Sequence, residues 1–235
     1  MNIYNFFICV ISAFVIAGCV GDAPRRDVGV QYLGAEYKLD PLGEGFGYDA
    51  DPRVRFDAFD CTTFVETVLG DGDVERLDKI RYRDGVVAFE NRNHFIETDW
   101  MENNADIVEN ASSKYGPVSR RELVVDKRAW ARAVHGIDID VAPRDAVIEY
   151  IAYDDLHAID NNEPLIVLFI VGKSEKYAKI STDIAVVHMG FLLPGGKVLR
   201  HASTGRGVVD DDFAQYVHMR QNMGNNIGIA LVRIK

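Results

Sequence analysis

The chain has 235 residues, with 26 Lys and Arg against 36 Asp and Glu, so its formal net charge at pH 7 is -10. Hydrophobic residues make up 48% and charged residues 26%, which is typical of a globular protein and argues against a disordered or fibrous chain. The acidic excess argues against non-specific binding to nucleic acid, because phosphate contacts need clustered Lys and Arg. Three cysteines are too few for a disulfide framework.

The first 18 residues are predicted to form a secretory signal peptide. Residues 6–17 are an uncharged apolar run of the length that signal peptides use, shorter than the roughly 20 residues of a membrane span. Ile16-Ala17-Gly18-Cys19 follows directly and resembles the bacterial lipobox, in which the cysteine is lipidated and becomes the new N-terminus. Residues 1–5 carry no Lys or Arg, unlike most signal peptides, and the alternative is a buried N-terminal helix.

We therefore expect Cys19 to carry lipid, residues 19–27 to form a short polar tether, and residues 28–235 to form one domain. Val20 after the lipid site, by resemblance to proteobacterial sorting, predicts the periplasmic side of the outer membrane. Cys61 is then the only thiol of the domain, and it is either an inert buried side chain or a nucleophile.

A helix is predicted over residues 61–69. Asp60 is a typical N-cap, and the apolar Cys61, Phe64, Val65 and Val68 recur at helical spacing on one face, before a Gly-Asp-Gly stretch ends the helix. A thiol in the first turn faces unpaired N–H groups at the positive end of the helix dipole. With an imidazole nearby, we expect the pKa of this thiol to fall from about 8.5 to between about 3.5 and 7.5.

The remaining elements change from helical to extended along the chain. Residues 73–160 are predicted to mix short helical and irregular segments, with a helix over 142–152. The C-terminal third is predicted to contain a fully apolar strand over residues 165–171 and a hairpin around Pro194-Gly195-Gly196, whose strands are 184–193 and 197–202. A short capped helix over 210–217 and a final strand over 227–234 follow. A helix followed by several adjacent strands indicates an α+β fold with an antiparallel sheet.

The hairpin singles out two of the six histidines. If Pro194-Gly195 is a two-residue turn, His188 and His201 stand directly opposite each other on one face of the sheet. With a three-residue turn the register slips by one and the two side chains point to opposite faces. On one face, one imidazole could act as a base while the other fixes its tautomer. The alternative is two histidines on a solvated sheet face.

Several segments together resemble a family of bacterial cell-wall hydrolases. Residues 59–66 (FDCTTFVE) are similar to the Asp-Cys-Ser-Gly-Phe-Val nucleophile helix of the NlpC-type papain-like hydrolases. Within that superfamily the chain looks most like the N-acetylmuramoyl-L-alanine amidase-like family first catalogued as domain of unknown function 1460. The further matching segments, in the order of the family, are 32–37, 80–85, 91–95, 99–100, 187–190, 200–203 and 228–233.

This resemblance implies an α+β papain-like fold in which the nucleophile helix packs on an antiparallel β-sheet. It implies that Cys61 is the nucleophile, His188 the general base and His201 the residue that orients the base. Tyr37 corresponds to a tyrosine whose hydroxyl assists the oxyanion site together with the Cys61 N–H. Glu36 stands where the family usually has a proline.

Other residues lie in stretches that match the subfamily but not the wider superfamily. We expect them to shape substrate choice, with arginine holding a carboxylate and tryptophan stacking on a sugar. They are Arg81, Arg83, Arg92, His94 and Trp100. The alternative is that Arg81 and Arg92 pair with nearby acids while Trp100 fills the core. No zinc site is expected, because the domain has one thiol and no His-x3-His or Cys-x2-Cys pair.

The resemblance implies a cofactor-independent cysteine amidase of cell-wall turnover or recycling. It would hydrolyse the bond between N-acetylmuramic acid, or its anhydro form, and L-Ala in peptidoglycan fragments. The alternatives are a γ-D-glutamyl-diamino acid endopeptidase, an acyltransferase and a non-catalytic peptidoglycan-binding lipoprotein. We expect a monomer that contacts the membrane only through its lipid.

Overall fold

The computed structural model describes residues 28–235, and for residues 176–178 only the backbone. The predicted signal peptide, the lipid site at Cys19 and the tether lie outside the described residues. In the described part, no helix is both long and apolar enough to cross a membrane.

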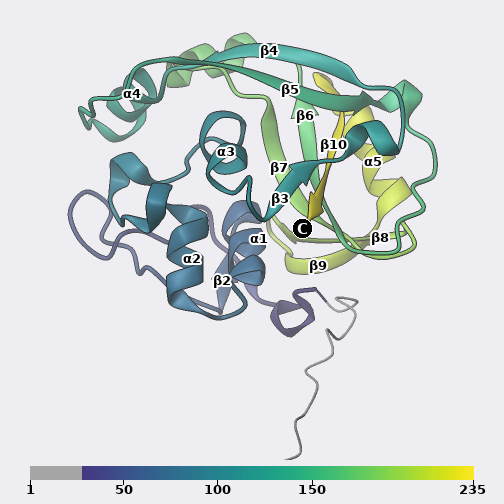
Figure 1. Ribbon diagram of the computed structural model, residues 1–235, viewed down its shortest axis with the longest axis horizontal. Helices are drawn as coiled ribbons and strands as arrows, with labels where there is room; N and C mark the ends of the chain where they lie inside the picture. Colours follow the sequence, from purple (N-terminus) through teal and green to yellow (C-terminus); the bar gives the residue numbers. More distant parts are fainter. Residues whose placement is uncertain (1–27) are drawn as a thin grey trace, which may run out of the picture.

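An eight-stranded sheet runs through the described part of the chain, and all its neighbouring strands are antiparallel. The strand order is β4-β5-β10-β6-β7-β8-β9, with β3 also paired to β10 (Figure 1). The strands are β3 Val108–Asn110, β4 Ser119–Val125, β5 Arg144–Ala152, β6 Leu165–Val171, β7 Val186–Leu192, β8 Val198–Ser203, β9 Gly207–Asp212 and β10 Asn226–Ile234. Two further strands, β1 Glu36–Tyr37 and β2 Ala58–Phe59, pair in parallel.

Helices and helical turns cover the sheet and fill its connections. The α-helices are α1 Cys61–Gly70, α2 Val74–Arg81, α3 Met101–Asn103, α4 Lys127–Trp130 and α5 Phe213–Gln221. The 3-10 turns are η1 Val30–Tyr32, η2 Arg83–Gly85, η3 Phe89–Asn91, η5 Ser112–Lys114, η7 Tyr153–Asp155 and η8 Glu175–Ile180. Two π-turns are η4 Ile96–Trp100 and η6 Ala131–His135. The expected α+β class with an antiparallel sheet is confirmed.

Strand β6 separates two hydrophobic cores, which explains its unbroken apolar run. Ile166, Leu168 and Ile170 belong to the core that includes α1, and the alternate residues belong to the core that includes α5. Because successive side chains of a strand point to opposite faces, α1 and α5 cover opposite sides of the sheet. On the α1 side, the Phe64 ring lies 5.8 Å from that of Phe191 on β7. The predicted strand over 165–171 is confirmed.

Several predicted segments differ from the structure, including residues 119–125 of the middle region, which form strand β4 instead of a helical or irregular segment. The helix expected over residues 142–152 is wrong, because this segment is strand β5, in which Ala146 and Ile148 are buried while Val147 and Glu149 are exposed. That two-residue period is typical of a strand with one covered face. The short helix expected over 210–217 begins later, at Phe213, because residues 207–212 pair with β8 and Asp212 is the N-cap.

Candidate active site

The helix predicted from Cys61 is confirmed, and its N-terminus is closed by a capping box. Asp60 Oδ1 accepts from the Thr63 N–H at 2.8 Å, and Thr63 Oγ1 accepts from the Asp60 N–H at 3.0 Å. The first N–H groups of a helix have no partner inside the helix, so that of Cys61 is available to another acceptor, while that of Thr62 faces the Cys61 thiol. Cys61 is the first residue of α1 and is partly buried.

Pairing of β1 with β2 brings Tyr37 to the start of α1. Tyr37 lies opposite Phe59, two residues before Cys61. The Glu36 N–H donates to the Asp57 carbonyl at 2.9 Å, a bond that the family's usual proline could not make. Glu36 therefore fixes this loop by a hydrogen bond instead of by ring rigidity. Burial raises the pKa of Tyr37, although a hydrogen bond with Thr204 opposes the shift.

The turn between β7 and β8 is longer than expected. The Leu193 N–H donates to the Val198 carbonyl at 2.9 Å, so the loop comprises residues 194–197, and neither the two-residue nor the three-residue turn considered from the sequence is present. Gly195 and Gly196 both have positive φ, which the longer loop uses. The register moves by two residues, so the predicted common face of the two histidines is kept while their direct opposition is lost.

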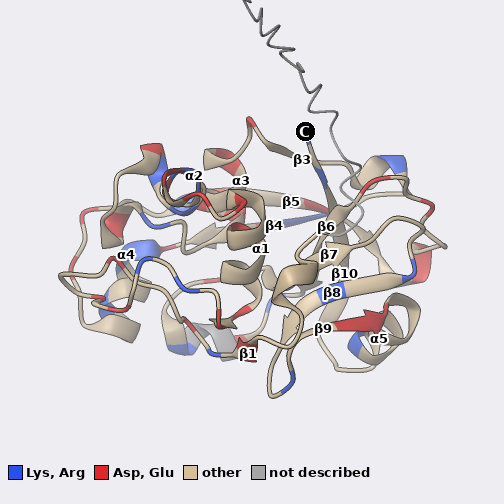
Figure 2. Ribbon diagram, turned by 90° about the horizontal axis from the view of Figure 1, so that it is seen from below, with Lys and Arg blue, Asp and Glu red and all other residues tan. Residues whose placement is uncertain are grey.

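His188 and His201 nevertheless contact each other directly. His188 Nε2 lies 2.7 Å from His201 Nδ1, and His201 Nε2 lies 2.9 Å from Asp211 Oδ2. Asp211 in turn accepts two hydrogen bonds from Arg206, which lower its pKa to about 2. Asp211 belongs to the acidic end of β9, which lies beside α5 (Figure 2). The four side chains form one continuous hydrogen-bonded line.

The ionised Asp211 determines the tautomer of both imidazoles. A carboxylate can only accept, so His201 Nε2 carries a proton and, in the neutral ring, His201 Nδ1 is an acceptor. His188 Nε2 must then donate to it, which leaves the lone pair of His188 Nδ1 free. The free nitrogen of His188 is the one that does not contact His201.

Burial determines the charge state of the site. It holds the pKa of His188 well below its usual value, assisted by the nearby His201 and Arg220, and it also lowers the pKa of His201. Burial, followed by the Asp60 carboxylate, raises the pKa of Cys61 to about 11, although the Met189 and Thr62 N–H groups oppose this. This direction is opposite to the lowering expected from the helix N-terminus, because desolvation of the thiolate outweighs the dipole.

Two hollows meet at Cys61 and His188. The first, here called the Trp130 hollow, has a volume of about 220 Å³ and a largely apolar wall that includes Trp130, Ile180, Ile184 and Val186. The second, here called the Arg220 hollow, has a volume of about 700 Å³ and is lined by Tyr37, Ser203, Thr204, Arg206, Asp211, Asp212, Gln215, Tyr216, Met219, Arg220 and Met223. Both hollows are also lined by Cys61, Val187 and His188. A substrate can therefore extend in two directions from the thiol.

Polar groups of the Trp130 hollow come from the turn η4 and the segment before it. Glu97 Oε1 accepts from the Ala185 and Val186 N–H groups at 2.6 Å each, and burial raises the pKa of Glu97. The His94 ring lies 4.6 Å from that of Trp130, and burial holds the pKa of His94 well below its usual value. His94 thus lines the Trp130 hollow, and its role in binding substrate stays a prediction.

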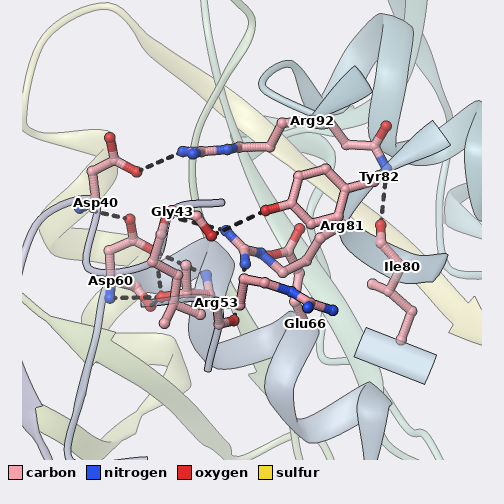
Figure 3. A network of polar contacts seen from close by, with 12 residues as sticks. Asp40, Gly43, Arg53, Asp60, Glu66, Ile80, Arg81, Tyr82 and Arg92 are labelled. Carbon is pink, nitrogen blue, oxygen red and sulfur yellow. Dashed lines mark hydrogen bonds and ion pairs between the residues drawn. The ribbon is translucent and has the colours of Figure 1, made fainter. Parts of the chain in front are cut away.

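Arg81 and Arg92 lie apart from both hollows, in a buried network (Figure 3). Arg81 Nε is 3.4 Å from the Glu66 carboxylate, and Arg92 contacts the Glu44 and Asp49 carboxylates at 2.7 and 2.6 Å. The two guanidinium groups thereby join the 40–53 loop to the helical segments. These contacts match the alternative interpretation, in which both arginines pair with nearby acids.

Trp100 is fully buried in the core, whereas Trp130 lines the hollow. Arg83 is exposed, and its guanidinium donates a hydrogen bond to Asn91 Oδ1 at 2.9 Å.

Sequence reasoning missed Asp211 and Trp130. Strand alternation could have identified Asp211. Val209 pairs with His201, and Asp211 lies two residues later on β9, on the same face of the strand as Val209. No local pattern distinguishes the two tryptophans. Within residues 28–235, no group of His, Cys, Asp or Glu could hold a metal ion.

Comparison with known proteins gives the family. The family model described as N-acetylmuramoyl-L-alanine amidase-like (AmiA-like) matches residues 27–225. The chain belongs to this family. No curated protein matches the sequence.

Members of the same structural group have low sequence identity to this chain. A Legionella pneumophila protein of the DUF1460 family has a TM-score of 0.80 at 20% identity, over 88% of this chain and 87% of its own. An N-acetylmuramoyl-L-alanine amidase from Bacteroides uniformis has a TM-score of 0.69 at 20% identity, over 90% and 99%. A Bacteroides fragilis chain described as a candidate xylanase reaches 0.68 at 22% identity, over 89% and 100%. These similarities show a shared fold, and a fold alone does not determine the substrate.

Proposed function

We propose that this protein is a cysteine amidase of the papain-like, NlpC type. It would hydrolyse the bond between the lactyl group of N-acetylmuramic acid, or of its anhydro form, and L-Ala in peptidoglycan fragments. The observation that carries the proposal is the hydrogen-bonded line of His188, His201 and Asp211, together with the presence of Cys61 and His188 in the lining of both hollows. Family membership supports the amide bond as the target.

The proposed reaction begins with both the thiol and the imidazole neutral, as their pKa shifts favour. His188 Nδ1 takes the thiol proton while Cys61 Sγ attacks the carbonyl carbon, so proton transfer accompanies attack. The Cys61 N–H and the Tyr37 hydroxyl stabilise the oxyanion. His188 then returns its proton to the leaving amine, and a water activated by the same nitrogen hydrolyses the thioester.

His201 and Asp211 act on this reaction through His188. When His188 becomes an imidazolium, its Nε2–H still donates to His201 Nδ1, and the Asp211 charge stabilises the cation through His201. We assign His201 and Asp211 as positioning residues, and Cys61 and His188 as the catalytic residues.

The Trp130 hollow is the proposed sugar site. Its walls combine an indole ring with the Glu97 carboxylate, and a sugar offers an apolar face and several hydroxyl donors. Trp130 thereby takes the role that the sequence analysis gave to Trp100, whose ring is buried in the core. His94 would contribute the edge of the same site.

We also propose that residues 1–18 are removed and that Cys19 is lipidated, which would hold a monomeric domain on the periplasmic side of the outer membrane. The support is the order of apolar run, small residues and cysteine. Cys19→Ala should abolish the lipid mass and release the protein from the membrane fraction. Unchanged fractionation together with an unmodified wild-type mass would rule out the anchor.

Mass spectrometry of purified muropeptides treated with the full chain tests the activity. Free N-acetylmuramic acid, or its anhydro form, together with an intact peptide that begins at L-Ala is the expected result. Release of L-Ala-D-Glu would replace the amidase by an endopeptidase. Products coupled to an added amine would indicate an acyltransferase.

Cys61→Ser is the matched variant for the mechanism. We expect it to bind muropeptides and to unfold at the wild-type temperature, while hydrolysis falls below detection because serine is far less acidic than cysteine. Full activity of Cys61→Ser would show that Cys61 is a structural thiol. Wild-type binding without any product would instead favour a non-catalytic binding protein.

A further inference from the structure

Arg220 on α5 lines the Arg220 hollow without a carboxylate partner. Within residues 28–235, no Asp or Glu forms an ion pair with its guanidinium, and its buried Nε has no hydrogen-bond partner. The guanidinium lies over the Phe169 ring, 5.3 Å from its centre. Partly buried charges in folded proteins are usually paired, because desolvation without compensation is costly.

The groups around Arg220 are neutral. Its charge lowers the pKa of His188 and of His201, so it lies within electrostatic range of the proposed base. The neighbouring Tyr153 hydroxyl is neutral and buried. Burial raises its pKa to about 12, although the charge of Arg220 and a hydrogen bond with that side chain oppose the shift. None of these groups offers the negative charge that a guanidinium favours.

The two acids of the same hollow are already engaged elsewhere. Asp211 accepts from Arg206 and lies 2.9 Å from His201, and Asp212 caps α5 by accepting from the Gln215 N–H at 2.8 Å. The Arg206 charge is therefore compensated within the protein, whereas that of Arg220 is left for a ligand. No Lys or Arg is among the described residues that line the Trp130 hollow, so it offers an anion no cationic partner.

We propose that Arg220 binds a free carboxylate in the peptide of the substrate, and that the peptide therefore lies in the Arg220 hollow. The inference rests on the proposed function, because it assigns a direction to the same substrate across Cys61. In that substrate the lactyl carboxyl group is consumed in the scissile amide, so free carboxylates occur only in the peptide. The planar guanidinium suits a carboxylate through paired hydrogen bonds.

A ligand pair tests this contact. In full-length Cys61→Ser, calorimetry would compare N-acetylmuramoyl-L-Ala-D-Glu with its diamide at about pH 8, where histidines are neutral. We expect the diacid to bind about 10- to 100-fold more tightly, as is typical of a charge-assisted hydrogen bond. Adding Arg220→Gln should bring this ratio close to one, and Arg220→Lys should keep part of it.

Arg120→Gln is the charge-matched control, because Arg120 lies on β4 with 66% of its side chain exposed. It should leave the ratio unchanged. Equal affinity for diacid and diamide before any change at Arg220, or a preference that survives Arg220→Gln, would overturn the inference. Wild-type hydrolysis separates the two proposals. A diacid bound through Arg220 but never cut would overturn only the amidase, whereas equal cleavage of diacid and diamide would overturn only the carboxylate contact.

Discussion

Asp211 determines which nitrogen of His188 is free, although it never contacts that ring. The effect passes through His201. Its Nδ1 lies 2.7 Å from His188 Nε2, and its Nε2 lies 2.9 Å from Asp211 Oδ2. A neutral imidazole has one donor and one acceptor, so fixing one nitrogen fixes the other. The chemistry proposed at Cys61 therefore depends on a carboxylate two hydrogen bonds away.

Asp211→Asn should test this dependence. Removal of the charge destabilises the imidazolium of His188, so we expect kcat to fall by up to about 100-fold. Because burial lowers the pKa of His188, we expect the acid limb of kcat/KM in the wild type to lie below pH 6.5, and we expect it to move to still lower pH in Asp211→Asn. The measurement is the pH profile of hydrolysis.

Asp210→Asn is the matched control, because Asp210 pairs with Arg200 at 2.7 Å and not with His201. It should leave the position of the acid limb unchanged. An unaltered pH profile in Asp211→Asn would mean that Asp211 only holds β9 in place.

At the scale of elements, close approach of β7 and β8 depends on Gly190. A Cβ at this position would lie 2.7 Å from the His201 Cβ and 2.8 Å from the Arg200 carbonyl oxygen. The strands pair only near the turn, at Phe191 with Arg200 and Leu192 with Leu199, so His201 has room to bond His188. Absence of a side chain at Gly190 thus allows the contact between the two rings.

Gly190→Ala should push β8 away from β7 and separate His201 from His188. We expect the free energy of unfolding to fall by about 1–3 kcal/mol, as in other overpacked cores, and kcat to fall as well. Urea unfolding and steady-state kinetics measure the two effects. Gly224→Ala, at a position with open space around its Cβ, should change neither quantity. Wild-type stability of Gly190→Ala would show that the strands can separate freely.

Sequence patterns predicted the elements whose signals are local. The N-cap at Asp60 and the helical spacing of apolar residues predict helix α1. The unbroken apolar run at 165–171 predicts β6, and the largely apolar run near the C-terminus predicts β10. The sequence pattern of β5 predicts a helix because its strand character depends on pairing with β4, and the paired residues are 19 or more positions apart in the chain. Likewise, Asp211 joins the site through the pairing of β8 with β9, and burial of Trp100 rather than Trp130 depends on the packing of the whole chain.

At the scale of the whole molecule, buried neutral histidines make stability depend on pH. Burial lowers the pKa of His94, His188 and His201 in the folded state. Below about pH 6.5 the unfolded chain binds protons that the folded chain does not, so stability decreases as pH falls. Burial also raises the pKa of Asp40 and Glu97 and raises that of Glu66 to about 8, and these carboxyl groups act in the opposite direction, Glu66 over the same pH range as the histidines.

We expect the free energy of unfolding to fall between about pH 6.5 and 5.5, by up to about 1.4 kcal/mol per pH unit for each of these histidines. Urea unfolding at a series of pH values measures the change, and NMR titration of the histidine ring protons identifies the groups responsible. A flat profile over this range, with ring protons that titrate near pH 6.5, would contradict the buried neutral state.

The position of β10 has a consequence for biosynthesis. This strand, formed by Asn226–Ile234, lies between β5 and β6, so the sheet is divided until these residues have been translated. At common elongation rates the preceding chain takes about 10–45 s to synthesise. During that time the nascent chain has unpaired strand edges and cannot complete the scaffold that holds the two histidines. Pairing of β10 with β5 and β6 is therefore the step that joins the two parts of the sheet.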